Sequence, residues 1–230
     1  MGAVDTTDFQ RARSPQAKQR REAAILDAAR ALGAERGIRQ VTLTDIAAAV
    51  GMHKSALLRY FETREEIFLR LTATGWQEWA PVLCDAIGRV ADGDAAGVAA
   101  AFARTLAARG MFCDLLAQAP MNLERNVSVE AVRAFKLVTL AAVDAVVAEV
   151  RARLPELTEA DGVDLMAAAT SMAGSFWNIA TPGPEIAALY RADPRLAHAV
   201  VDVEPRLARI LTAQLEGAVA GRRGGAIGDA

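Results

Sequence analysis

The sequence predicts an all-α protein in which a small three-helix unit precedes a larger helical body. Apolar side chains recur at helical spacing along the whole chain, and no segment shows the two-residue alternation of a half-buried strand. Hydrophobic residues make up 53 % of the 230 residues, which is enough to build a large core. Between residues 41 and 61 two very short helices follow each other, and such helices need a third one to support them.

The supporting helix is expected near the N-terminus. We expect residues 1–16 to form a flexible basic arm and the first helix to run from about residue 17 to residue 36. Ile25 and Leu32 lie on one face of that helix and predict the side that is buried. Gly37 is suited to the position after a helix C-terminus, because glycine readily adopts the left-handed conformation required there.

The two short helices have recognisable start and stop residues. Thr42 and Asp45 have the spacing of a capping box, in which each side chain accepts a hydrogen bond from the other residue's backbone N–H. Gly51 ends the first short helix, and the second is expected over Lys54–Phe61. Together with the supporting helix they predict a helix-turn-helix unit over residues 17–62, whose second short helix lies in the major groove of duplex DNA.

Side chains on the outer face of this unit are suited to contact DNA. With Leu57 and Phe61 turned inward, the opposite face presents small, apolar and basic groups that can reach base edges or phosphates. The candidates are Lys54, Ser55, Leu58 and Arg59, joined by Thr42 and Thr44 at a helix N-terminus that can hold a phosphate. The net charge is −2, yet residues 1–61 hold ten Lys/Arg against six Asp/Glu, and the remainder holds sixteen against twenty-two. The basic end therefore coincides with the candidate DNA-binding unit.

The segment from about Arg20 to Leu71 resembles the DNA-binding head of the TetR family of bacterial regulators. The resemblance rests on the motifs TLTDIAAAVG at 42–51, LLRYF at 57–61 and TREEI at 63–67. It implies an all-helical homodimer whose variable C-terminal body binds a small-molecule inducer, usually in a repressor.

Four positions agree with or depart from the family pattern. Tyr60 and Arg64 stand where the family has phosphate contacts, although Tyr60 also fits a core position and Arg64 a charge on a helix face. Leu58 replaces an aromatic residue, most often Tyr, and His53 replaces a small polar cap. His53 is therefore either a base contact or a turn residue, and the resemblance does not imply a particular operator sequence.

The body is expected over residues 63–218 and begins with a long helix. Thr63 and Glu66 have the spacing of a second capping box, and the helix is expected to continue to about Pro81. Further helices are expected at about 95–109, 111–118, 128–154, 158–180 and 203–217. The Pro-containing stretch 181–202 is expected to be irregular, and residues 219–230 are expected to form a disordered tail.

Aromatic, Met and amide side chains are concentrated in the body, where they could line a ligand pocket. Trp76 and Trp79 lie at the far end of the long helix, so a ligand bound there could tilt the DNA-binding unit. Small-molecule sites are mostly apolar with a few polar groups, which predicts a small hydrophobic effector. The candidates are Trp76, Trp79, Phe102, Met111, Phe112, Met121, Asn122, Phe135, Met166, Phe176, Trp177 and Asn178. Ordinary core packing remains the alternative for each of them.

The uncharged helix near 165–180 contains small residues that let another helix approach closely. With the last helix of the body it is expected to form a four-helix bundle between two subunits of a homodimer; burial within one subunit is the alternative. The candidates are Ala167, Ser171, Ala173 and Gly174, together with Leu207, Ile210, Leu211 and Leu215.

Other functional classes find little support in the sequence. An enzyme would need a nucleophile–base pair or a metal site, yet the chain has only two histidines and no glycine-rich phosphate loop. We therefore expect no catalytic residue, no cofactor and no metal. One alternative function remains open, that of a helical protein that binds a ligand or partner without specific DNA binding.

Cellular location is also constrained by the sequence. Cys84 and Cys113 lie in apolar surroundings and are expected to be buried thiols in a reducing cytoplasm. The N-terminus lacks the apolar segment of a signal peptide. The helical part of the uncharged stretch 165–184 reaches only about 24 Å, less than the roughly 30 Å hydrocarbon core of a membrane. We expect a cytoplasmic protein with no membrane partner.

Overall fold

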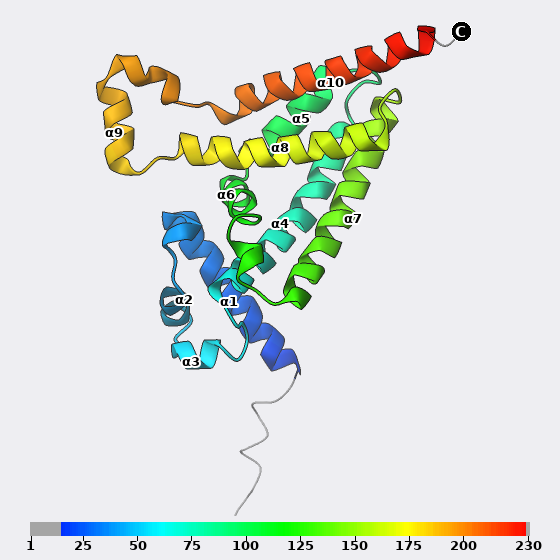
Figure 1. Ribbon diagram of the computed structural model, residues 1–230. Helices are drawn as coiled ribbons and strands as arrows, with labels where there is room; N and C mark the ends of the chain where they lie inside the picture. Colours follow the sequence, from blue (N-terminus) through cyan, green and yellow to red (C-terminus); the bar gives the residue numbers. More distant parts are fainter. Residues whose placement is uncertain (1–14, 229–230) are drawn as a thin grey trace, which may run out of the picture.

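The structure, a computed structural model, describes residues 15–228, and that part of the chain consists of helices and the loops between them (Figure 1). The all-α class predicted by the sequence is confirmed. The elements are α1 (Pro15–Arg36), η2 (Ile38–Gln40), α2 (Leu43–Ala49), α3 (Lys54–Leu57), α4 (Arg64–Ile87), α5 (Ala95–Ala107), α6 (Gly110–Gln118), η3 (Leu123–Arg125), α7 (Val129–Arg153), α8 (Glu159–Ala180), α9 (Pro184–Ala192), η4 (Pro194–Ala199) and α10 (Val203–Gly228). Residues 1–14 of the expected arm lie outside the described residues.

The N-terminal unit, which we call the head, packs α2 and α3 against α1 and the first turns of α4. Its core is formed by side chains that are at most 3 % exposed: Ile25, Ala29, Ile38, Ile46, Leu57, Phe61 and Ile67. Burial of each larger side chain contributes roughly 1.5–3 kcal/mol. This explains how α2, with seven residues, and α3, with four, stay folded although helices of that length are not stable alone. The predicted three-helix head is confirmed, but its second short helix is shorter than expected: α3 ends at Leu57, and residues 58–60 form a turn where the sequence predicted helix as far as Phe61.

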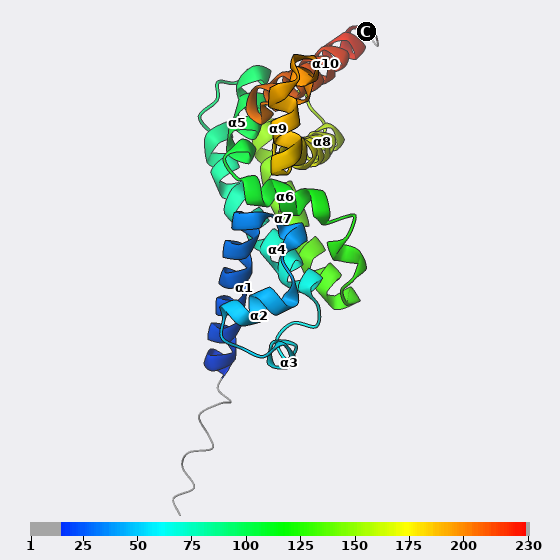
Figure 2. The ribbon, with the colours of Figure 1, turned by 90° about the vertical axis from the view of Figure 1, so that its left-hand side faces the viewer.

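The body surrounds the upper part of α4 with α5, α6 and α7, and α8 and α10 lie across its far end (Figure 1). Figure 2 shows the head at one end of the molecule and α8, α9 and α10 at the other. Trp79 of α4 is fully buried, and its indole N–H donates to the Thr105 hydroxyl of α5 at 3.0 Å. Its ring lies 6.2 Å from that of Phe102 and 5.7 Å from that of Phe112. α4 is therefore continuous from the head into the centre of the body core.

The long helix α4 extends further than the sequence predicts. Pro81 lies inside it, although proline removes a backbone donor and crowds the carbonyl one turn earlier. Pro81 is exposed, so water can reach that carbonyl, and Leu83 and Ile87 beyond it are fully buried. The packing of these two side chains outweighs the local cost of the proline, and the helix continues to Ile87.

Two other segments also differ from expectation. The stretch 181–202 contains a helix, α9, which begins with Pro184 at a position where a missing backbone N–H costs nothing. α10 continues to Gly228, where a disordered tail was expected from residue 219. Arg222 accounts for part of this continuation, because its guanidinium reaches the Asp161 carboxylate at the start of α8 at 3.1 Å.

The two cysteines have different surroundings. Cys113 is buried as expected, and burial raises the pKa of its thiol to about 12. Cys84 is only half-buried, contrary to expectation, and its pKa is raised mainly by the same desolvation. No helix within residues 15–228 is both long and apolar enough to cross a membrane.

Candidate DNA-contacting surface and effector pocket

The turn between α2 and α3 is held by backbone and side-chain hydrogen bonds. The Thr42 backbone N–H donates to the Asp45 carboxylate at 2.8 Å, and the Asp45 N–H donates to the Thr42 hydroxyl at 3.2 Å, which completes the predicted capping box. Gly51 has φ +64°, a conformation that L side chains rarely adopt, and it ends α2 as expected. The Met52 N–H then donates to the Ala47 carbonyl at 2.9 Å. These contacts fix the angle at which α3 leaves α2.

His53 is the N-cap residue of α3. Its Nδ1 lies 2.8 Å from the Ser55 hydroxyl and accepts from the Ser55 backbone N–H at 3.4 Å. The imidazole thus satisfies a backbone donor at the start of α3 and is itself oriented by Ser55. These hydrogen bonds are what the alternative role of His53, that of a turn residue, requires. The ring is nevertheless exposed on the surface of the head, so a base contact also stays open.

The outer face of α3 is exposed as the sequence predicts. Leu57 and Phe61 are buried, whereas Lys54, Ser55 and Arg59 are exposed and Leu58 is 44 % exposed. An exposed leucine between two basic residues can meet a thymine methyl group in the major groove. Thr42 and Thr44 are exposed at the N-terminus of α2. All six of these side chains are therefore accessible on the head.

Arg64 has a different environment from the one expected for a phosphate contact. Its guanidinium donates to the backbone carbonyl oxygens of Val41 and Ile38, and it pairs with the Glu65 carboxylate at 2.8 Å. It also lies over the Phe68 ring, 4.8 Å from the centroid, and the side chain is only 16 % exposed. Arg64 is engaged in joining α4 to the loop before α2. Tyr60 is half-buried and packs against the core, so both of its predicted roles stay open.

The second predicted capping box differs in detail. The Thr63 hydroxyl accepts from the Glu66 backbone N–H at 3.0 Å, as expected. The Glu66 carboxylate, however, accepts from the N–H of Glu62 at 2.7 Å rather than from that of Thr63. The reciprocal hydrogen bond therefore comes from the residue before Thr63. The backbone N–H groups of Glu62 and Glu66 both have a partner at the start of α4.

A direct connection between body and head was missed in the sequence. Asp114 of α6 is 9 % exposed, and its carboxylate accepts from the backbone N–H of Ile38 in the head at 3.1 Å. Close beside it, a Cβ on Gly33 of α1 would lie 3.1 Å from the Met111 side chain of α6. The sequence gives little signal for this contact, because Asp114 and Ile38 are 76 residues apart.

The predicted ligand-binding residues do not form a single cluster. Trp79, Phe102, Phe112 and Met166 are part of the packed core. Met121 is 74 % exposed in the loop after α6, and the Asn178 amide donates to the Gly174 carbonyl of its own helix at 3.0 Å. Trp177 packs so closely on Gly110 that a Cβ there would lie 2.1 Å from its ring. Most of these aromatic residues pack against one another or against small residues.

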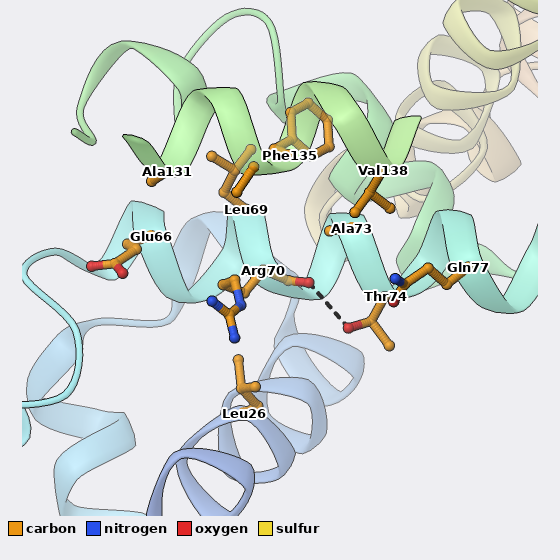
Figure 3. A pocket seen from close by; sticks show the side chains of 11 residues that line it. Leu26, Glu66, Leu69, Arg70, Ala73, Thr74, Gln77, Ala131, Phe135 and Val138 are labelled. Atoms are coloured by element: carbon orange, nitrogen blue, oxygen red, sulfur yellow. Dashed lines mark hydrogen bonds between the residues drawn. The ribbon is translucent and has the colours of Figure 1, made fainter. Parts of the chain in front are cut away.

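Three cavities lie against α4. The first, of about 290 Å³, is bounded by α1, α4 and α7 and contains the predicted residue Phe135 (Figure 3). The second, of about 490 Å³, lies between α4 and α7 and contains Trp76. The third, of about 300 Å³, lies between α1, α4 and α6 and contains Met111 and Phe112. Helix α4, which the sequence singled out as the pocket wall, lines all three.

The predicted dimer residues divide into two groups. Ala173, Leu207, Leu211 and Leu215 are at most 2 % exposed within the single subunit. Gly174 is also buried, and a Cβ there would lie 2.9 Å from the Ala117 backbone nitrogen of α6. These residues belong to the core of one subunit and are unavailable to a partner, which corrects the prediction. Ala167 and Ser171 are exposed and Ile210 is half-buried.

Comparison with protein families places both parts of the chain. Residues 25–71 match the family model of bacterial regulatory proteins of the TetR family. Residues 73–222 match the model of a tetracycline-repressor-like C-terminal domain. Among curated protein sequences none matches the chain significantly.

Solved structures share the fold at low sequence identity. A possible TetR family regulator from Streptomyces coelicolor A3(2) is 21 % identical, with a TM-score of 0.59 over 86 % of this chain and 98 % of that one. RolR in complex with resorcinol is 14 % identical, with a TM-score of 0.55 over 91 % and 95 %. The fatty acid degradation regulator FadR from Bacillus halodurans is 14 % identical, with a TM-score of 0.53 over 88 % and 95 %.

Proposed function

The chain belongs to the TetR family of bacterial transcriptional regulators, and we propose that it is a repressor that binds an inverted-repeat operator as a homodimer and is released by an apolar small molecule. The single observation that carries this proposal is the continuity of α4. The helix begins beside the exposed face of the head and forms the wall of three cavities in the body. A ligand that shifts α4 therefore moves the head.

DNA binding by the outer face of α3 is supported by exposure and charge. Lys54 and Arg59 are exposed, and neither pairs with a carboxylate among the described side chains. Free basic groups on an accessible face are suited to phosphates and to guanine edges. Because Arg64 is engaged with the backbone of the head, we assign the phosphate contacts to Lys54, Arg59 and the N-terminus of α2.

Dimerisation is supported by an exposed stripe on α8. Val163, Ala167, Ser171, Ser175 and Ile179 follow one another at four-residue intervals and are all exposed. The stripe carries no charge and consists mostly of small residues, so the α8 helices of two subunits can approach closely. A two-fold axis through this stripe would present two copies of α3 to one duplex, which is the reason to expect an inverted repeat.

An apolar effector is supported by the cavity between α4 and α7. None of the residues lining it is charged, and its volume lies in the usual range for small-molecule sites. Trp76 lines it, and the indole N–H of Trp76 is buried without a hydrogen-bond partner. A buried donor left unpaired costs about 1–3 kcal/mol, so a small shift that lets a ligand accept this bond would favour binding. RolR, which shares the fold, holds resorcinol, a small aromatic molecule.

The test is operator binding measured against salt. A duplex containing the inverted repeat from the DNA flanking the gene is titrated with the protein by fluorescence anisotropy at several salt concentrations. If each subunit neutralises about three phosphates, log K should fall with log salt with a slope of about −5. A Lys54→Ala, Arg59→Ala double variant should reduce the slope to about −2, because about one phosphate contact per subunit remains, while leaving the helix content unchanged. A wild-type slope near −1 would contradict this mode of binding. Ligand binding without any operator binding would favour the alternative function, a binding protein that keeps the fold.

A further inference from the structure

Two of the cavities on α4 adjoin each other along one side of the molecule. The cavity of about 290 Å³ and that of about 490 Å³ share Gln77 and Val138 as lining residues. They therefore adjoin each other along α4 and α7, from Leu26 of α1 to beyond Pro81, with Gln77 and Val138 at their junction. We call the two together the groove. From Arg70 to Pro81 the helix rises about 16 Å, which is long enough for a chain-like ligand.

The end of the groove near the head carries a basic group. Arg70 of α4 lines it, is exposed, and forms no ion pair with any described carboxylate. Figure 3 shows the Arg70 side chain between α4 and α1, extending towards Leu26. Glu66 lines the same end, but one of its carboxylate oxygens already accepts from the Glu62 backbone N–H at 2.7 Å. That hydrogen bond does not neutralise Glu66, so this end carries one positive and one negative group, and Arg70 is the charged group that can donate to an anion.

The remainder of the groove is mostly apolar, with Thr74 and Gln77 as its uncharged polar lining residues. Leu69, Ala73 and Phe135 continue it from Arg70, and Trp76, Ala80 and Ala142 line its far part. No charged residue lines the far cavity. Leu137, at its rim, is 51 % exposed. A ligand that covers this surface would remove apolar area from water, which is favourable.

We propose that this groove binds an amphipathic organic anion, with its carboxylate at Arg70 and its apolar chain along α4 and α7. The proposal rests on the proposed function and refines it: the effector is apolar along its chain and carries one anionic group at the end near the head. A guanidinium pairs with a carboxylate through two parallel hydrogen bonds, which an alcohol or an alkane cannot reproduce. The ligand would touch Leu26 of the head and Phe135 of the body at once, and could thereby change the angle between them.

The experiment compares dodecanoate with dodecanol, both below their aggregation limits, on the full-length protein. Binding is followed by the quenching of tryptophan fluorescence. Wild type should bind dodecanoate five- to tenfold more tightly than dodecanol. Arg70→Met, which keeps the length and loses the charge, should abolish this preference by weakening dodecanoate alone. Arg133→Met removes an exposed charge of α7 that does not line the groove, and should leave both affinities unchanged.

A chain-length series locates the apolar part. Each methylene that enters the groove should tighten binding about fourfold, until the groove is filled. Ala141→Trp, at the far cavity, should weaken long carboxylates and spare short ones.

The outcomes separate this inference from the proposed function. An Arg70→Met variant that keeps the wild-type preference for dodecanoate overturns the anion site, even if a neutral molecule releases the operator. Absence of binding by either molecule in a protein that binds its operator also overturns it and leaves the regulator intact. Charge-dependent binding of dodecanoate by a protein without operator binding keeps the site and overturns the function.

Discussion

Arg64 illustrates how a residue's surroundings decide its role. The guanidinium donates to two backbone carbonyls of the segment that leads into α2, and it stacks on Phe68. These contacts hold the segment before α2 in place relative to α4. The family resemblance assigns a phosphate contact to this position, and the alternative of a charge on the helix face is closer to what the structure shows. We therefore expect Arg64 to act on DNA binding through the shape of the head.

The first prediction follows from those contacts. Arg64→Ala leaves two carbonyls without their charged donor and should lower the free energy of unfolding by about 1–3 kcal/mol, as measured by urea denaturation. Operator affinity should fall as well, because the head is less well ordered. Arg59→Ala is the matched control: Arg59 is exposed, so its removal should weaken DNA binding and leave stability unchanged. Unchanged stability of the Arg64 variant would restore the phosphate role.

Sequence reasoning at the residue scale succeeds where the partner is near in the chain. The Thr42–Asp45 box and the end of the first short helix at Gly51 depend on neighbours within a few residues, and both are found. The partners of Arg64 are 23 and 26 residues away, and that of Asp114 is 76 away. No periodicity or spacing marks such pairs, so they appear only once the chain is folded.

At the scale of elements, α8 shows why small residues do not by themselves identify the face of a helix that meets a partner. Small residues occur all round this helix. One side of the helix packs on α6, and the other side is exposed. Gly174 and Ala173 are on the packed side, whereas Ala167 and Ser171 are on the open side. Small side chains favour close helix packing with any neighbour. The sequence therefore indicates that α8 is packed closely and does not indicate against which helix.

The candidate ligand residues have the same ambiguity. Aromatic residues at helical spacing predict either a core or a pocket, and most of those in the body fill the core. The groove residues that matter for the further inference, Arg70 and Leu26, are one charged residue and one ordinary aliphatic residue. They come together because α1 and α7 lie on either side of α4 (Figure 3).

The contact between α8 and α10 gives a prediction about pH. Hydrogen bonds from Arg222 and then from Thr158 lower the pKa of Asp161 to about 2, from an ordinary value of 3.8. A carboxyl group with a lowered pKa in the folded state stabilises the fold fully above its unfolded pKa, and this contribution is lost as the pH falls. The window is therefore from about pH 4 down to about pH 2.

The measurement is thermal unfolding of wild type and Asp161→Asn across that window. At pH 6 the variant should unfold at a lower temperature, because it lacks the charge that holds Arg222. The difference between the two melting temperatures should shrink as the pH falls from 4 to 2. Because other carboxyl groups titrate in the same range, only this difference is informative. Arg222→Met should behave like Asp161→Asn, and a constant difference at all pH values would show that the ion pair does not stabilise the fold.

At the scale of the whole molecule, the head is too small to select an operator alone. The outer face of α3 and the turn after it offer four exposed side chains, and specific DNA-binding proteins commonly pair two such helices about a two-fold axis. The dimer proposed on the α8 stripe supplies the second copy. In such a dimer, a change in the angle between head and body of each subunit changes the distance between the two α3 helices. A rigid duplex tolerates little change in that distance.

The last prediction tests whether the exposed residues of α8, rather than its buried ones, form the dimer interface. Residues near a two-fold axis face their own copies, so Ala167→Arg with Ser175→Arg should place like charges opposite each other and yield a folded monomer in sedimentation experiments. Ala148→Arg, at an exposed site on α7, should remain a dimer. Gly174→Arg should damage the subunit itself, because even a Cβ there would lie 2.9 Å from the Ala117 backbone of α6.

The monomeric variant also tests how DNA is bound. With one head instead of two, it should neutralise about three phosphates rather than six, and the slope of log K against log salt should fall from about −5 to about −3. Its affinity for the full inverted repeat should approach that for a single half-site, since the second contact is no longer made within one complex. A folded monomer that keeps the wild-type affinity and slope would mean that a single head makes every contact, and both the stripe and the inverted-repeat operator would be wrong.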